Sequence, residues 1–537
     1  MKKTALTLAL SLCATAAAQG FSLTPPPPAA PAESTRVAAP AGPVIGSLDR
    51  GLRIWEGIPY AQPPVGDLRW RAPRPLPAWT AEKSALQAGA ACTQYLSVPG
   101  QGQGFQRGQE DCLTLNVYAP ENAQNLPVMV WIHGGSFNLG ASTDYDPRAL
   151  AREQGVVVVS MNYRLGALGF LATPGLEEDG SVGNYGLLDQ QLALKWVRQN
   201  VAAFGGDAAN VTVFGELAGG MSICQQLLMP GSKGLFDKAI IQSGPCTAPS
   251  ITANRADALK VGAGTAEALG CKAGDAACLR ALPLEKVVRA TPPGQGLVPA
   301  SVPFPPIYAD PTLPTAPTAA FGAQGTAQAA NVLPVPVLIG STQDESRLFA
   351  AWIGDPKKDL GPFEYLAAAL LLNGPDGWKA LTYYPASHYP TRTLALAASG
   401  TDITFSCPTS DIARSRAEQV PTYAYEFRDR NVPTNQMLRP TVGVPSFGAF
   451  HSSEVAGILG TSATLVDYSR FTPKQLELAR TMRTYWANFA RTGNPNGAGL
   501  TEWPRLDAAG MNVLAFAPGA VGVVDDFRSF HKCGIAW

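Results

Sequence analysis

The stretch that decides the fold is VTVFGELAGGMSICQQLLM, residues 211–229. Its first part, VTVFGE, is rich in β-branched residues and predicts a buried strand. Its last part, MSICQQLLM, carries apolar residues at helical spacing and predicts a helix. Between them, GELAGG leaves room only for a tight turn, and its glycines suit a sharply bent backbone. The stretch therefore predicts a strand, a turn and a helix in direct succession.

The neighbouring segments repeat this alternation. Two apolar runs have strand length, LPVMVWIHGG (126–135) and GVVVVSMNYR (155–164), whereas GLLDQQLALKWVRQNVAAFGG (186–206) has helical periodicity. Strands that alternate with helices indicate a parallel sheet, because parallel neighbours need a long crossover connection. We therefore expect an α/β fold with a large, mostly parallel central sheet and helices on both faces.

The composition fits a globular protein with a small neutral ligand. The 537 residues include 41 basic and 41 acidic side chains, and 46% are hydrophobic. Balanced charge provides no electrostatic surface for nucleic acid, so we expect no nucleic-acid partner. Beyond the N-terminus, no run reaches the roughly 18 apolar residues of a membrane span. The oligomeric state does not follow from these residues.

The N-terminus has the pattern of a secretory signal. MKKTALTLALSLCATAAAQG (1–20) joins two lysines, an apolar run that includes Cys13, and small residues around Ala18. The Pro- and Ala-rich segment that follows predicts an extended tether. We expect a signal peptide over 1–18, a tether over 19–43 and a single domain over 44–537. The protein is therefore expected to be secreted or periplasmic.

Cysteine usage agrees with export. The chain has nine cysteines, so an even number remains once Cys13 is assigned to the signal segment. An even number of cysteines in an exported protein favours disulfides. Cys92 with Cys112, and Cys271 with Cys278, each bracket a short loop. These two pairs are expected to be local cross-links.

The glycine-flanked turn carries a motif with one departure. A strand-to-helix turn written G-x-S-x-G is the nucleophile elbow of α/β-hydrolases, in which serine stands at the centre. Here the residues are Gly215, Glu216, Leu217, Ala218 and Gly219, so Leu217 occupies the nucleophile position. Leucine has neither a lone pair nor a transferable proton, and its branched side chain fills more space than serine.

Ten separate stretches beyond residue 44 share the order of one known family: GIPYAQPPVGDLRWRAP, EDCLTLNVY, VMVWIHGGSFNLG, NYRLGALGFL, GNYGLLDQQLALKWV, FGGDAANVTVFGELAGG, QSGP, TQDESRLF, GAFHSSE and YWANFARTGNPN. On these stretches the chain resembles the type-B carboxylesterases, the family that includes the cholinesterases. The resemblance implies an α/β-hydrolase that acts on carboxylic esters, without a cofactor or a metal.

The resemblance also implies site residues. The catalytic acid falls on Glu345 in QDES and the base on His451 in GAFHSSE, and the order elbow, acid, histidine is the order of this fold. The oxyanion hole falls on the backbone N–H groups of Gly135, Ser136 and Ala218. Ser136 stands where glycine is commoner, which leaves the N–H in place.

Three disulfides are implied by the same resemblance: Cys92 with Cys112, Cys271 with Cys278, and Cys407 with Cys533. Cys224 and Cys246 remain over, and the sequence leaves their pairing open. Cys224, on the helix behind the elbow, is expected to be a buried apolar thiol.

One departure bears on the substrate. Cholinesterases carry a tryptophan in the first disulfide loop, which stacks on quaternary ammonium groups. The corresponding TQYLSVPGQGQGFQRGQED (93–111) has none. We therefore expect neutral carboxylic esters rather than choline esters.

Leu217 leaves competing hypotheses for the function. The first is an esterase silenced at its nucleophile, inactive or severely impaired, since hydrolases without a triad member retain only roughly 10³- to 10⁴-fold acceleration over water. The second is a non-catalytic exported binding protein on the esterase fold. The third is a residual esterase with another nucleophile, such as Ser243. Retention of Glu345, His451 and the glycine-rich loop favours the first.

Overall fold

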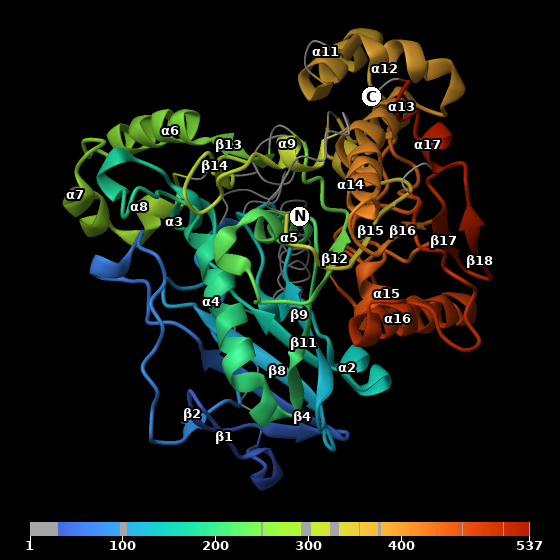
Figure 1. The fold of residues 1–537 in the computed structure, drawn as a ribbon. Helices are drawn as coiled ribbons and strands as arrows, with labels where there is room; N and C mark the ends of the chain where they lie inside the picture. The colour runs from blue at the N-terminus through green and yellow to red at the C-terminus, as the bar shows by residue number, and fades with distance from the viewer. Residues whose placement is uncertain are drawn as a thin grey trace, which may run out of the picture.

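An 11-stranded mixed sheet forms the centre of the molecule, in the order β18-β17-β16-β15-β12-β11-β9-β10-β8-β4-β3 (Figure 1). The computed structural model describes residues 30–96, 105–248, 251–290, 302–322, 332–353, 355–373, 377–463, 465–507 and 510–535. The strands are β3 Ser47–Asp49, β4 Leu52–Pro59, β8 Thr114–Pro120, β9 Leu126–Ile132, β10 Val157–Met161, β11 Gly206–Glu216, β12 Lys238–Gln242, β15 Val337–Thr342, β16 Thr422–Phe427, β17 Val513–Ala517 and β18 Ala520–Val524.

The middle of this sheet is parallel. Strands β10, β9, β11, β12, β15, β16 and β17 pair in parallel with their neighbours, whereas β8, β4, β3 and β18 add antiparallel edges. Strands β10, β12, β15 and β16 are buried along their whole length. Continuous apolar runs are required there because a parallel strand is covered on both faces. The predicted α/β class is confirmed.

Helices pack around the sheet (Figure 1). Among them, α4 and α5 contact each other and β11, while α2, α15 and α16 form a second group that contacts β9, β10 and β11. The helices are α2 Arg148–Gln154, α3 Gly166–Phe170, α4 Tyr185–Asn200, α5 Ala218–Leu228, α6 Arg255–Ala268, α7 Ala276–Ala281, α8 Leu284–Val288, α9 Pro317–Phe321, α10 Arg347–Ala350, α11 Pro362–Asn373, α12 Gly377–Tyr383, α13 Arg392–Thr401, α14 Cys407–Ala417, α15 Val455–Leu459, α16 Pro473–Thr492 and α17 Phe527–Phe530.

The expected tether is partly folded. A 3₁₀ turn, Glu33–Thr35, is followed by β1 (Val37–Ala39), which pairs with β2 (Gly42–Ile45). Trp55 Nε1 donates to the carbonyl of Thr35, and the Thr35 hydroxyl accepts from a backbone N–H of the fold. The prediction of an extended tether to residue 43 is therefore wrong from Glu33 onward. The predicted signal peptide lies outside the described residues.

Three shorter sheets complete the strands: β1 and β2 with β5 (Lys83–Ser84), β6 (Gln94–Leu96) with β7 (Phe105–Arg107), and β13 (Ala253–Asn254) with β14 (Ile307–Tyr308). Within the described ranges, no helix is both long and apolar enough to cross a membrane.

Four disulfides cross-link the fold. Three join the pairs that the resemblance implied, Cys92–Cys112, Cys271–Cys278 and Cys407–Cys533. The fourth joins Cys224 to Cys246, so the prediction of a buried free thiol at Cys224 is wrong. The two cysteines meet because α5 packs closely against the segment after β12. A Cβ atom built on Gly220 would lie 3.1 Å from the Cα atom of Gly244.

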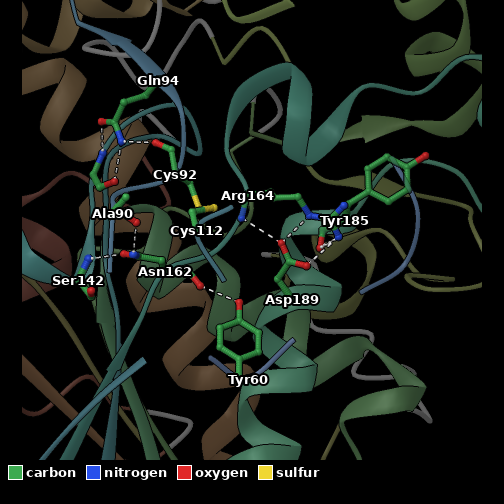
Figure 2. Close-up of a disulfide and its surroundings, with 11 residues drawn as sticks. Tyr60, Ala90, Cys92, Gln94, Cys112, Ser142, Asn162, Arg164, Tyr185 and Asp189 are labelled. Atoms are coloured by element: carbon green, nitrogen blue, oxygen red, sulfur yellow. Dashed lines mark hydrogen bonds and ion pairs between the residues drawn. A yellow bond between two sulfur atoms is a disulfide. The ribbon is translucent and has the colours of Figure 1, made fainter. Parts of the chain in front are cut away.

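A buried ion pair lies near the first disulfide (Figure 2). Arg164 Nη2 is 2.7 Å from Asp189 Oδ1, and Arg164 Nε donates to Asp189 Oδ2 at 2.8 Å. The same Asp189 oxygen accepts the backbone N–H of Arg164 at 3.0 Å. The pair connects the chain after β10 to helix α4, and water reaches almost none of either side chain.

Asp189→Asn is expected to lower the free energy of unfolding by about 3–5 kcal/mol, because it leaves the buried Arg164 charge without its counter-charge. Denaturant unfolding monitored by fluorescence measures the change. The control is Glu285→Gln, which removes an exposed ion pair with Arg289 and should change stability by less than about 1 kcal/mol. Equal effects for the two substitutions would contradict this account of the buried pair.

Candidate active site

The predicted elbow is a sharp turn between β11 and α5. Leu217 joins them with φ 49° and ψ −113°, and its side chain is 7% exposed. The turn is tight because the first turn of α5 packs against β9. A Cβ atom built on Gly219 would lie 1.9 Å from the carbonyl oxygen of Ile132, so only glycine fits there. A branched residue with this positive φ is a strained outlier.

The predicted acid and base lie together behind the turn. Glu345 follows β15, and its Oε2 is 2.6 Å from Nδ1 of His451, which lies in the loop before α15. Both side chains are almost fully buried. The other oxygen of Glu345 accepts the backbone N–H of Thr342 at 2.8 Å. A carboxylate held in this way fixes the tautomer and the orientation of the imidazole.

Ser243 lies at the acid rather than at the elbow. Its hydroxyl donates to Glu345 Oε1 at 2.6 Å, and the residue is fully buried. The hydrogen bond orients the carboxylate on the side away from His451. The proton of Ser243 is therefore directed to Glu345 and not to a base, which argues against Ser243 as a replacement nucleophile. Ser222, the serine that follows the elbow on α5, accepts a hydrogen bond from Gln190 at 2.9 Å and is buried as well.

The other ring nitrogen of His451 faces the elbow carboxylate. Nε2 is 2.9 Å from Glu216 Oε1, yet it has no hydrogen bond of acceptable geometry. The same Glu216 oxygen accepts the Ser452 hydroxyl at 2.5 Å. Burial alone would lower the pKa of His451, but the carboxylates of Glu216 and Glu345 raise it to about 10. The two carboxylates therefore favour the protonated form of the imidazole.

Sequence reasoning missed two members of this cluster, Glu216 and Glu454. Glu454 is fully buried, and burial followed by repulsion from Glu216 and Glu345 raises its pKa to about 8. Gln242 donates to Glu454 at 3.1 Å and accepts from Trp486 Nε1 at 3.1 Å. Both acids lie within motifs already singled out, one beside Leu217 and one three residues after His451. The presence of an acidic residue inside each motif was the sequence signal that could have identified them.

The glycine-rich loop after β9 lies beside the elbow. A Cβ atom built on Gly134 would lie 3.5 Å from the Cβ atom of Leu217. The next two residues, Gly135 and Ser136, have φ angles of 109° and 53°. Such left-handed residues turn successive backbone N–H groups toward one side, which makes a concavity for an anion. Ala218 begins α5, whose N-terminus adjoins the same loop.

The surroundings hold this loop firmly. His133 stacks on Tyr163 with ring centroids 4.4 Å apart, and the Tyr163 hydroxyl donates to the carbonyl of His133 at 2.8 Å. Burial lowers the pKa of His133 to about 4, so the ring is neutral. At the far end, Gln94 exchanges two hydrogen bonds of 2.9 Å with the backbone of Gly140. Figure 2 shows Gln94 beside the Cys92–Cys112 disulfide.

The cluster places an oriented carboxylate–imidazole pair near a glycine-rich loop. Groups of three or more His, Cys, Asp or Glu side chains able to hold a metal ion do not occur among the described residues. Leu217, at the centre of the predicted elbow, has no nucleophilic side-chain atom. Part of the disulfide loop that lacks tryptophan, residues 97–104, lies outside the described residues.

Comparison with known proteins identifies relatives over most of the chain. The sequence model described as "Carboxylesterase family" matches residues 33–528. The para-nitrobenzyl esterase of Bacillus subtilis (strain 168) is 37% identical over 483 residues, which cover 86% of this chain and 91% of the relative. The human cocaine esterase is 33% identical over 500 residues, 87% of this chain and 85% of the relative.

Solved structures give the same result. A PNB esterase structure superposes with a TM-score of 0.75 at 34% identity, over 93% of this chain and 99% of that chain. A structure titled thermophilic PNB esterase gives a TM-score of 0.76 at 33% identity, over 94% of this chain and 100% of the other. The site described above lies within the matched region. The chain belongs to the carboxylesterase family and has an α/β-hydrolase fold.

Proposed function

We propose that the chain is a hydrolase of neutral carboxylic esters that lacks its nucleophile, and that it is inactive or severely impaired as it stands. Glu345 and His451 are the acid and base of this proposal, and the backbone N–H groups of Gly135, Ser136 and Ala218 form the oxyanion hole. Leu217 holds the place of the nucleophilic serine. The non-catalytic binding protein remains the alternative.

One observation carries the proposal. His451 is buried and oriented through Nδ1 by Glu345, and its Nε2 lies beside the elbow, 2.9 Å from Glu216 Oε1 but without a hydrogen bond of acceptable geometry. A buried polar atom without a hydrogen bond is unfavourable and calls for an explanation. A hydroxyl at residue 217 would supply the partner that Nε2 lacks. Leucine has no side-chain atom that can form such a hydrogen bond.

With serine at residue 217, each remaining group has a defined task. Nε2 of neutral His451 accepts the hydroxyl proton as the oxygen attacks the ester carbonyl carbon, and it later returns a proton to the leaving alcohol. Glu345 stabilises the imidazolium that forms. The negative charge on the carbonyl oxygen is stabilised by the backbone donors of the glycine-rich loop and α5. Water then hydrolyses the acyl-enzyme by the same route.

Export is part of the proposal. The N-terminal pattern predicts a signal peptide, and four disulfides join all the cysteines of the chain except Cys13. Disulfides persist in oxidising compartments and are rare in the cytosol. Both observations support a secreted or periplasmic location.

Leu217→Ser is expected to raise the hydrolysis of p-nitrophenyl butyrate by at least about 10²- to 10³-fold, because it restores the nucleophile to a site whose other parts are present. Release of p-nitrophenol by the two purified proteins measures the gain. The control, Leu217→Ala, creates the same space without a hydroxyl and should remain inactive. A folded Leu217→Ser protein that is inert on short and medium acyl esters would favour the binding-protein alternative.

The pH dependence of Leu217→Ser tests the contact between Glu216 and His451. The two carboxylates favour the protonated imidazole, so the base form appears only at higher pH than the ordinary value of 6.5. kcat/KM is therefore expected to rise with pH through an apparent pKa above 6.5. Adding Glu216→Gln should move the inflection to lower pH. An inflection that stays in place would show that Glu216 does not influence the base.

Ser243→Ala in the Leu217→Ser background is expected to lower kcat by about tenfold, because the carboxylate of Glu345 loses one charge-assisted hydrogen bond. KM should change little, since Ser243 is buried behind the acid. Steady-state kinetics separate the two parameters. If the unaltered chain hydrolyses esters and Ser243→Ala abolishes that activity, Ser243 is the nucleophile after all.

A further inference from the structure

A second buried histidine is clamped between two carboxylates near the C-terminus. His531 follows α17, and its side chain is 1% exposed. Nδ1 is 2.5 Å from Asp402 Oδ1, and Nε2 is 2.6 Å from Glu426 Oε1. The imidazole therefore joins the C-terminal segment to two separate elements, the turn after α13 and strand β16.

The groups around this clamp favour a charged imidazole. Burial alone would lower the pKa of His531, but Asp402 and then Glu426 raise it to about 9. Tyr384 donates its hydroxyl to Asp402 at 2.6 Å, and Arg428 pairs with Glu426. The Lys532 ammonium lies 4.4 Å from the centre of the Tyr384 ring.

The contact between His531 and Asp402 holds one end of a rare type of turn. Residues Asp402–Ser406 form a single π-helical turn between α13 and α14. Asp402 begins the turn, and Cys407, directly after it, forms the disulfide with Cys533. The C-terminal segment is thus attached to the turn at both of its ends (α17, α13 and α14 in Figure 1). The His531–Asp402 ion pair holds the start of the turn, and the Cys407–Cys533 disulfide lies directly after its end. Single π-turns are rare and often occur near functional sites.

Within this turn, Phe405 points to the proposed catalytic base. Its ring centroid is 5.0 Å from that of His451, and the ring centroid of Phe349 is also 5.0 Å from that of His451. The rings of Phe349 and Phe405 are parallel, with centroids 5.9 Å apart. Glu345 fixes His451 at one atom only, through Nδ1. Together with Glu216 beside Nε2, the phenyl rings limit rotation of the imidazole about that hydrogen bond.

We propose that His531 is a positioning residue for His451, acting through Asp402 and the π-turn to seat Phe405 against the imidazole. The expected effect on catalysis rests on the proposed function. The expected effect on the orientation of the His451 ring does not. When the ion pair is lost, the turn loses one of its two attachments to the C-terminal segment, and Phe405 is free to withdraw. The imidazole then tilts, and Nε2 leaves its place beside the elbow.

The kinetic test replaces both charged partners of the ion pair with uncharged side chains in the Leu217→Ser background. Asp402→Asn combined with His531→Gln removes both charges together and leaves Glu426 paired with Arg428. kcat is expected to fall about 10- to 100-fold, with KM within about twofold, because a displaced base slows the chemical step. His388→Gln, at an exposed histidine, is the control. An unchanged kcat with a lower melting temperature would overturn the inference and leave His531 as an anchor only.

A spectroscopic test uses the unaltered Leu217 chain and needs no activity. With ¹⁵N-labelled histidine, the Nδ1 proton that His451 shares with Glu345 gives a signal that His451→Gln identifies by its loss. This signal is expected to shift or broaden in the Asp402→Asn/His531→Gln protein and to stay unchanged in His388→Gln. Constancy of the signal in the double variant overturns the inference. A shifted signal with an inert Leu217→Ser protein would support the positioning and reject the proposed function.

Phe405→Leu tests the middle of the connection and covers the case in which the double variant does not fold. It leaves both ion pairs of His531 intact. The His451 signal should shift as in the double variant, and kcat of the Leu217→Ser form should fall with little change in KM. If Phe405→Leu changes neither, the π-turn does not position the base and the inference fails.

Discussion

The whole site depends on the strained turn at Leu217. Strand β11 ends in the middle of the sheet, and α5 must begin at once, because its first turn packs on the carbonyl of Ile132 where no Cβ atom fits at Gly219. This close approach forces residue 217 into a positive φ whatever its side chain. The turn projects that side chain beside the glycine-rich loop. The backbone therefore keeps the geometry of an elbow even though leucine is a poor residue for it.

Around this turn several ionisable side chains are buried. Glu216, Glu345 and Glu454 lie near His451, and burial with repulsion from the other two carboxylates raises the pKa of Glu454 to about 8, which favours its neutral form. The arrangement is tolerated because each carboxylate has partners: Ser452 for Glu216, Ser243 and Thr342 for Glu345, and Gln242 for Glu454. Both ring nitrogens of the imidazole face carboxylates, Nδ1 toward Glu345 and Nε2 toward Glu216. These carboxylates raise the pKa of His451 and so oppose its action as a base.

The periphery supports this centre through cross-links that join distant parts of the chain. The Cys224–Cys246 disulfide ties the elbow helix to the segment after β12, which also carries Ser243. Cys407–Cys533 ties the C-terminal segment to the start of α14, next to the turn that carries Phe405. Rigid attachment of this kind matters in a reaction that requires an oriented base, because small displacements of the reacting groups lower the rate strongly.

The sequence by itself determined the fold class, the family and the strand–turn–helix with leucine at its centre. These are local properties: β-branched runs such as 211–216 specify strands, helical spacing specifies α4 and α5, and short motifs mark their connections. Only the tertiary structure decided which distant groups meet. It placed Ser243 on Glu345, paired Cys224 with Cys246, folded residues 33–43 onto the domain, and brought Glu216 to His451. The reason is that partners separated by tens or hundreds of residues are selected by the packing of helices on the sheet, and that packing leaves no periodic signal in the sequence.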